Sequence, residues 1–131
     1  MLNRLDDQTG KFLLRAGLGL LLLPHGIEKL LGGVLDVQRL LAAAGLPEPL
    51  GYGVFIGELV APLMLIAGYH ARWAALLVVI NMLVAIALAH AAEVFAFDSD
   101  GIPVLELQYL FLLTALAVVF LGAGRWAFKG R

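Results

Sequence analysis

The sequence predicts an all-α membrane protein. We expect one domain over residues 1–131, a bundle of four transmembrane helices with a short amphipathic interfacial helix between spans one and two. Composition is the first reason: 62% of the residues are hydrophobic, the mean hydropathy is +0.95 and 15% are charged, whereas soluble domains are about 45–50% apolar and about 25% charged. The second reason is that four apolar stretches, each separated by Gly, Pro or charged residues, reach or approach the length that crosses a bilayer.

The same composition excludes several classes of function. The chain has no cysteine, which rules out disulfides, thiol catalysis and iron–sulfur ligation by this chain. Its net charge of −1 offers no basic surface for nucleic acid. The start, MLNRLDDQTGKF, lacks the apolar core of a cleaved signal peptide, so we expect none. The lipid bilayer is therefore the first expected partner.

The first span is predicted over residues 12–31. Twenty residues at about 1.5 Å per residue give about 30 Å, which is the thickness of the hydrocarbon core. Arg15 lies near the start, where we expect its long side chain to reach back to the headgroups as a structural polar residue. Pro24 is expected to kink the second half. Three ionisable residues follow it in this otherwise apolar stretch, namely His25, Glu28 and Lys29.

Gly32-Gly33 ends that span, and residues 34–46 predict the amphipathic helix. Thirteen residues are too few to cross a bilayer, so we expect this helix on the membrane surface or as a lid over the bundle. Its apolar residues recur at helical spacing: Val34, Val37, Leu40 and Leu41.

The remaining spans are predicted over residues 50–69, 73–92 and 105–121. Arg72 lies in a tight polar turn between the second and third spans and is read as structural. Asn81, near the middle of the third span, is read as an interhelical hydrogen-bond donor. The ionisable residues of these spans are Glu58 in the second, His90 with Glu93 just beyond the third, and Glu106 with Tyr109 in the fourth.

The distribution of Lys and Arg predicts the orientation. Seven lie on the side of the two termini and two on the other side, which by the positive-inside rule makes a multi-pass protein with both termini cytoplasmic. The first group is Arg4, Lys11, Arg15, Arg72, Arg125, Lys129 and Arg131, and the second is Lys29 and Arg39.

Counting residues from the span ends puts one ionisable cluster in the outer half of the membrane, with a contribution from every span. Charges at that depth are expected to face the bundle and pair, Lys29 with Glu58 or Glu106. One interpretation is a salt-bridge network that fixes helix register, or groups that reach the outer headgroups. The other is a polar substrate or quinone pocket that opens outward, formed by His25, Lys29, Glu58, His90, Glu106 and Tyr109.

Three chemistries remain open for this pocket. Histidine suits a hydrogen bond to a quinone carbonyl, with the glutamates relaying protons. A haem between His25 and His90 is another option. A two-metal centre is the third, although its usual helical pattern is Glu-x-x-His and here the order is reversed. Its ligands would be His25, Glu28, Glu58, His90, Glu93 and Glu106.

Several sequence motifs resemble the DoxX family of small four-span bacterial membrane proteins. They are Arg15-x-Gly-Leu-Gly running into His25-Gly-x-x-Lys29, Gly57-Glu58 followed by Ala67-Gly68 and Arg72, the stretch Met82 to His90, and Glu106 with Gly122-Ala-Gly124-Arg125. The chain departs from the family pattern at Glu28 and at Trp126-Ala-Phe-Lys, where a Ser-Leu-Asp-like segment is usual.

The resemblance implies a four-helix bundle in the bacterial cytoplasmic (inner) membrane and a role in redox physiology. Relatives include membrane subunits of a thiosulfate:quinone oxidoreductase. The leading hypothesis is a quinone-interacting component of an oxidoreductase system, whose electrons come from a partner protein or a bound cofactor. One rival is a non-catalytic scaffold that binds partner redox proteins through residues 34–46 and the basic tail. Another is a proton-coupled carrier, which would require a homo-oligomer.

Overall fold

The computed structural model describes residues 6–128, which form helices and contain no strand beyond an isolated bridge between Phe97 and Pro103. The expected all-helical fold is therefore confirmed. Arg4, Lys129 and Arg131, which entered the charge count, lie outside the described residues. The elements are α1 (Asp7–Gly32), α2 (Leu35–Ala43), the 3-10 turn η2 (Glu48–Gly53), the π-helical turn η3 (Ile56–Val60), α3 (Ala61–Ala67), α4 (Ala71–Ala89), η4 (Ala91–Glu93) and α5 (Glu106–Leu121).

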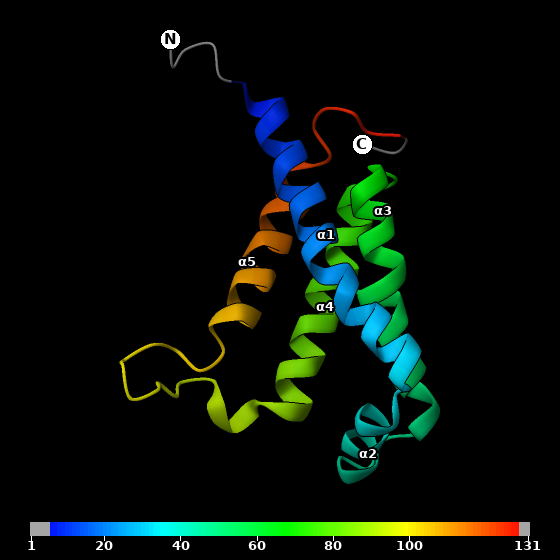
Figure 1. Ribbon diagram of the computed structural model, residues 1–131, viewed down its shortest axis with the longest axis vertical. Coiled ribbons are helices and arrows are strands. Elements are labelled where there is room, and N and C mark those ends of the chain that lie inside the picture. Colours follow the sequence, from blue (N-terminus) through cyan, green and yellow to red (C-terminus); the bar gives the residue numbers. More distant parts are fainter. Residues whose placement is uncertain (1–5, 129–131) are drawn as a thin grey trace.

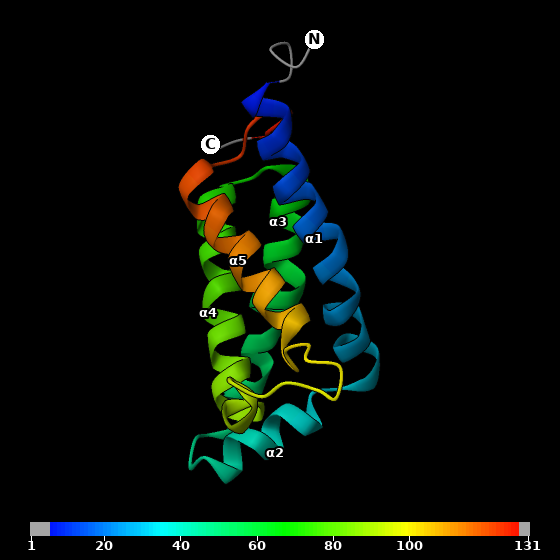
Figure 2. The same cartoon turned by 90° about the vertical axis from the view of Figure 1, so that its left-hand side faces the viewer.

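The long helical segments run alternately up and down (Figures 1 and 2). The start of α1 and the end of α5 lie at one end of the molecule, and α2 and η4 lie at the other. The four helices pack side by side in a ring: α1 contacts α3, α3 contacts α4, α4 contacts α5, and α5 contacts α1. We call the end that carries α2 the α2 end.

Two helical segments are long and apolar enough to cross a membrane: Glu48–Ala67 with 20 residues and Ala71–Ala89 with 19. A third qualifies if α1 and α2, which are bent by 91° at Gly33, are taken together. α5 is apolar but has 16 residues. Large apolar side chains cover the outside of all these helices, for example Leu13, Leu21, Leu83, Leu113 and Phe120. Such a surface indicates a lipid environment.

Small residues bring α4 and α5 together at the centre of the core. Ala74, Ala75 and Val78 of α4 and Ala115 of α5 are fully buried, and Val118 of α5 is 1% exposed. Close approach of two backbones through alanine is the usual packing of membrane helices, where no hydrophobic effect drives association.

Arg15 does not reach the headgroups as the sequence suggested, because its side chain is 0% exposed. The last turn of α3 and the segment after α5 both present carbonyl groups that have no helical partner, and a guanidinium has five N–H donors to give them. Arg15 uses all five, at 2.7–3.0 Å, toward the carbonyl oxygens of Leu65, Ile66, Ala123, Arg125 and Trp126. It therefore ties α1 to α3 and to the C-terminal segment.

The C-terminal segment crosses α1 by means of two glycines in the left-handed region, Gly122 at φ 84° and Gly124 at φ 71°. A Cβ on Gly124 would meet α1 itself, and one on Gly122 would come within 3.0 Å of the Arg72 guanidinium, which lies over this turn. The Arg125 backbone N–H then donates to the Gln8 carbonyl at 3.1 Å. Glycine is thus required at Gly124, where the segment touches α1, and at Gly122, where it passes the Arg72 guanidinium of α4.

Asp6 caps α1, and its pKa is held below the ordinary value of 3.8, chiefly by the backbone N–H of Thr9 and further by Arg125. A lowered pKa means that the carboxylate stabilises the fold above the ordinary value and that this contribution disappears as the pH falls through the folded-state pKa. We expect Asp6→Asn to lower the melting temperature slightly at neutral pH and to remove that part of the acid dependence. The melting temperatures of both proteins, measured between about pH 7 and pH 2, test this. The same dependence of the melting temperature on pH in both proteins would contradict it.

Candidate functional site

The site begins with an irregular turn around Glu58. Pro62 has no N–H, so the Glu58 carbonyl cannot accept the ordinary bond from the residue four positions later. The chain instead forms the π-helical turn Ile56–Val60, in which the Ala61 N–H reaches back to the Ile56 carbonyl. Such single π turns are frequent at functional sites. Glu58 therefore lies in a local distortion of the helix that Pro62 favours.

Gly26 lets α1 approach this turn. A Cβ at Gly26 would collide with the carbonyl carbon and oxygen of Glu58. Because α1 comes so close, Lys29, one turn further on, lies within reach of the Glu58 side chain. The Gly26 position thus sets the distance between the two charged residues.

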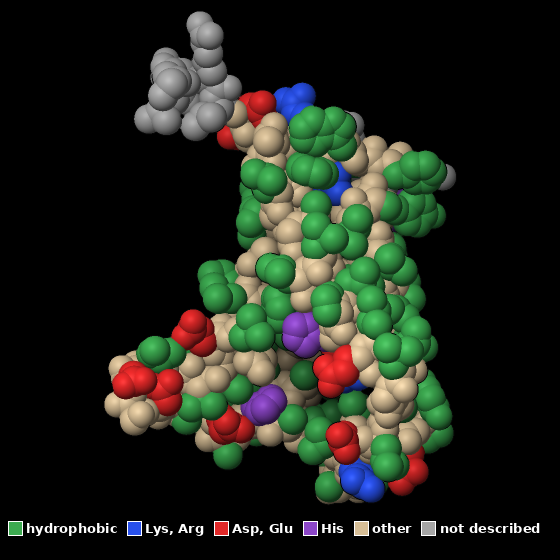
Figure 3. Space-filling view, in the orientation of Figure 1, with side chains coloured by type: hydrophobic (Ala, Val, Ile, Leu, Met, Phe, Trp, Pro, Cys, Tyr) green, Lys and Arg blue, Asp and Glu red, His purple; other side chains and the backbone are tan. Residues whose placement is uncertain are grey.

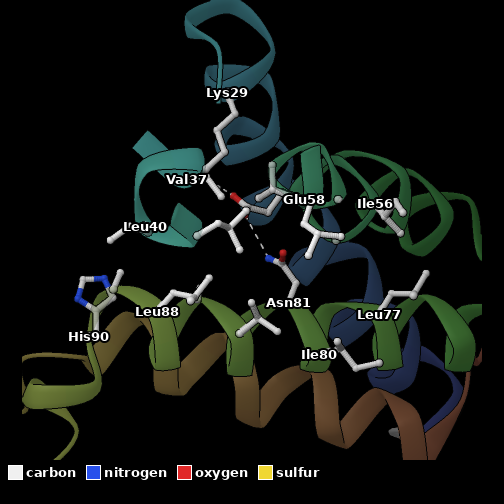
Figure 4. Close-up of a pocket in the computed structure, with 18 residues that line it drawn as sticks. Lys29, Val37, Leu40, Ile56, Glu58, Leu77, Ile80, Asn81, Leu88 and His90 are labelled. Carbon is white, nitrogen blue, oxygen red and sulfur yellow. Dashed lines mark hydrogen bonds and ion pairs between the residues drawn. The ribbon is translucent and has the colours of Figure 1, made fainter. Parts of the chain in front are cut away.

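Lys29, Glu58 and Asn81 form a hydrogen-bonded network between α1, η3 and α4 (Figure 4). Lys29 Nζ lies 2.6 Å from Glu58 Oε1, and Asn81 Nδ2 donates to Glu58 Oε2 at 3.2 Å. Glu58 is only 5% exposed, so its charge requires both partners. Lys29 thus pairs with Glu58, one of the two acids expected for it, and Asn81 of α4 donates to Glu58 of η3.

The network faces a cavity of about 530 Å³ between α2, η2, η3 and α4. Its walls are mostly apolar, and four polar side chains reach it. Binding sites for small molecules commonly have this composition, with a few polar groups that orient the ligand. We call it the Glu58 cavity; its lining is Lys29, Val37, Leu40, Leu41, Leu50, Gly53, Val54, Ile56, Gly57, Glu58, Leu77, Ile80, Asn81, Val84, Ala85, Leu88, Ala89 and His90.

The cavity is elongated along α4. Leu77, Asn81, Val84 and Leu88 recur three or four positions apart and form its wall on that helix. Asn81 and His90 are nine residues apart, which corresponds to about 13 Å along a helix. One small ring cannot contact both, so the cavity has two distinct polar ends.

His90 forms the second polar end. Its Nδ1 lies 3.0 Å from Glu93 Oε1, and both side chains are partly exposed at the α2 end. This contact turns the Nδ1 side of the imidazole toward Glu93 and leaves Nε2 without a contact to that carboxyl group. Glu93 thus orients the histidine.

The other expected pocket residues lie elsewhere. His25 packs its ring edge-on against Phe111 at 5.5 Å between centroids, and its buried Nδ1 has no hydrogen-bond partner within residues 6–128. Glu106 is exposed at the start of α5. The Tyr109 hydroxyl donates to the Val94 carbonyl and so holds the connection after α4 against α5. None of these three lines the Glu58 cavity.

The expected metal and haem ligands are not grouped either. Across residues 6–128, no three His, Asp or Glu side chains are placed to hold one metal ion. Glu58 is engaged by Lys29, and Glu28 and Glu106 are exposed. His25 packs on Phe111 whereas His90 lines the cavity, so the pair expected to hold a haem is not assembled around one space.

The sequence did not predict that α2 forms a wall of the site. Val37, Leu40 and Leu41 of α2 face the cavity. The space-filling view shows acidic and histidine side chains gathered around a hollow at the α2 end, whereas the middle of this face is apolar (Figure 3). The signals that point to these residues are the apolar spacing of residues 34–41 and the stripe on α4.

An apolar exterior, helices of membrane length and a partly buried ion pair define the class of this molecule as a small integral membrane protein. More particularly, the chain belongs to the DoxX family, whose model matches residues 10–91. The matched region contains all four polar residues of the Glu58 cavity. No curated protein and no solved structure matches the chain.

Proposed function

We propose that the protein is a quinone-interacting component of an oxidoreductase system in the bacterial cytoplasmic membrane and that the Glu58 cavity binds the quinone headgroup. The observation that carries this proposal is the Lys29–Glu58–Asn81 network at the wall of an otherwise apolar cavity.

The network matches the chemistry of a quinone. Quinone carbonyls accept hydrogen bonds, and Lys29 and Asn81 each retain N–H donors beyond the one that Glu58 engages. Glu58 holds both donors in place and balances the lysine charge. The apolar walls suit the ring and its substituents. We assign Lys29 and Asn81 to headgroup binding and Glu58 to positioning them.

The proposed topology has four spans with both termini cytoplasmic. It is supported by the alternating direction of the helices, by the shared end of the start of α1 and the end of α5, and by the surplus of Lys and Arg on that side. α5 would extend about 24 Å, so it crosses with its flanking residues close to the interface. α2 would lie at the outer interface.

Electron transfer requires a second component. Reduction of a quinone to a quinol takes two electrons and two protons, and this chain has no cysteine to supply them as a dithiol. We assign the electrons to a partner oxidoreductase and assign binding of the quinone to this protein. The partly exposed His90–Glu93 pair at the α2 end is the proposed point of proton exchange with water.

Substituting Glu58 tests the proposal. Glu58→Gln keeps the shape but removes the charge that orders Lys29, and we expect the affinity for a decyl-benzoquinone to fall about tenfold, because a hydrogen bond to a charged group contributes about 1.5–3 kcal/mol. Isothermal titration of protein in nanodiscs, corrected for partition into empty nanodiscs, measures it.

The matched control is Glu28→Gln, an exposed acid on α1, one residue before Lys29. It should leave the affinity unchanged. Equal affinities for the Glu58 and Glu28 variants, both shown to be folded by circular dichroism, would refute the quinone site.

A further inference from the structure

The Glu58 cavity has a mouth on the outer side of the bundle. Several residues that line it are also large exposed apolar side chains: Ile56 and Ile80 are each 50% exposed and Val84 is 48% exposed. Ile56 comes from η3 and the other two from α4, and Figure 4 shows Ile56 and Ile80 on the same side of the cavity. The opening between η3 and α4 is therefore rimmed by the kind of surface that faces lipid.

Toward the interior of the bundle the cavity is closed, whereas at the α2 end Leu40 and Leu50 are also exposed. Gly57 and Glu58 are buried in the π turn, and Leu41 of α2 is 5% exposed. The two helices that flank the opening belong to the segments of membrane length, Glu48–Ala67 and Ala71–Ala89. The opening therefore lies on a part of the surface that the bilayer covers.

The depth of the polar network points to the same route. Asn81 lies ten residues after the start of α4, which places it about 15 Å along the helix, near the middle of a hydrocarbon core of about 30 Å. The partly exposed end at His90 is about 13 Å further along. A headgroup at Asn81 is thus nearer to the lipid beside it than to the water at the α2 end.

We propose that the ligand is a tailed lipid whose head enters from the bilayer between η3 and α4, while its alkyl or isoprenoid tail remains in the mouth against Ile56, Ile80 and Val84. This inference rests on the proposed function, since it uses the same cavity, and it adds that these three apolar residues select for the tail. A water-soluble ligand would gain nothing from them.

Blocking the mouth tests the route. In Ile80→Trp the indole ring fills the mouth of the cavity from the lipid side. We expect a decyl-benzoquinone to bind at least about tenfold more weakly, which is the change in affinity produced when about two fewer methylene groups are buried. The tail-free dimethoxy-methyl-benzoquinone should keep its affinity within about twofold, because it makes no contact with the rim. Titration in nanodiscs, corrected for partition, gives both values.

Leu83→Trp is the matched control. Leu83 is on the same helix and 53% exposed, but it does not line the cavity. It should leave both affinities unchanged. Equal effects of the two tryptophan variants, or an equal loss of both probes in Ile80→Trp, would overturn the side entry.

Glu58→Gln, measured in parallel, separates this inference from the proposed function. If Glu58→Gln weakens the binding of both probes and Ile80→Trp leaves both affinities unchanged, the side entry is overturned and the quinone site stands. Unchanged binding of both probes in Glu58→Gln overturns the quinone site, and the side entry of a quinone is overturned with it.

Discussion

Replacing Arg15 by methionine is expected to lower the free energy of unfolding by about 3–5 kcal/mol, the range seen when a buried charged group is lost from its partners. Arg15 is fully buried, and five carbonyl oxygens from α3 and the C-terminal segment accept its hydrogen bonds. Methionine replaces the unbranched stem of arginine but is shorter and has no donor, so these carbonyls would be left unpaired. Unfolding in mixed micelles, followed by circular dichroism, measures the difference.

Arg39→Met provides the comparison for the same chemical change on the surface. The Arg39 side chain is 71% exposed and lies 3.8 Å from Asp36, a distance at which an exposed pair contributes about 0.5 kcal/mol or less. If Arg15→Met and Arg39→Met had equal stability, Arg15 would not hold the three segments together as the structure indicates.

Gly26→Ala should be the most damaging alanine substitution at a helical glycine of α1. The new methyl group would collide with the backbone of Glu58, so α1 or the π turn must shift. Overpacking of this kind costs about 1–3 kcal/mol. The shift also separates Lys29 from Glu58, so quinone affinity should fall with stability. Unfolding and titration on one protein preparation measure both effects.

Gly17→Ala is the control on the same helix. Nothing lies within 4 Å of the position that its Cβ would take. Alanine favours a helix over glycine by about 1 kcal/mol, so this variant should be as stable as the parent or more stable. A Gly26→Ala variant that behaved like Gly17→Ala would show that α1 does not approach the π turn so closely.

The positions of the helices could be predicted because hydropathy and the Gly and Pro signals act locally. The stretch 73–92 lies over α4, Ala71–Ala89, and the stretch 34–46 contains α2, Leu35–Ala43. The Lys29–Glu58 pair was predictable as well, since a lysine in an apolar span needs an acid at its own depth.

Two features depend on contacts that no local pattern reports. Arg15 binds carbonyl groups up to 111 residues away, and only the path of the C-terminal segment brings them there. Counting residues gives the depth of a side chain but not its direction around the helix axis, and His25 and Tyr109 therefore have suitable depths without lining the Glu58 cavity. The π turn had a signal in the sequence, the proline four residues after Glu58.

Photolabelling with an azido-quinone tests the central claim, that the Glu58 cavity is the quinone site, most directly. If the cavity binds the quinone, the label attaches to the segments that line it, namely Lys29 and residues 37–41, 50–58 and 77–90, and excess decyl-benzoquinone prevents this attachment. Mass spectrometry of the digested protein locates it. Competed labelling confined to α5 or to the first half of α1 would contradict the account.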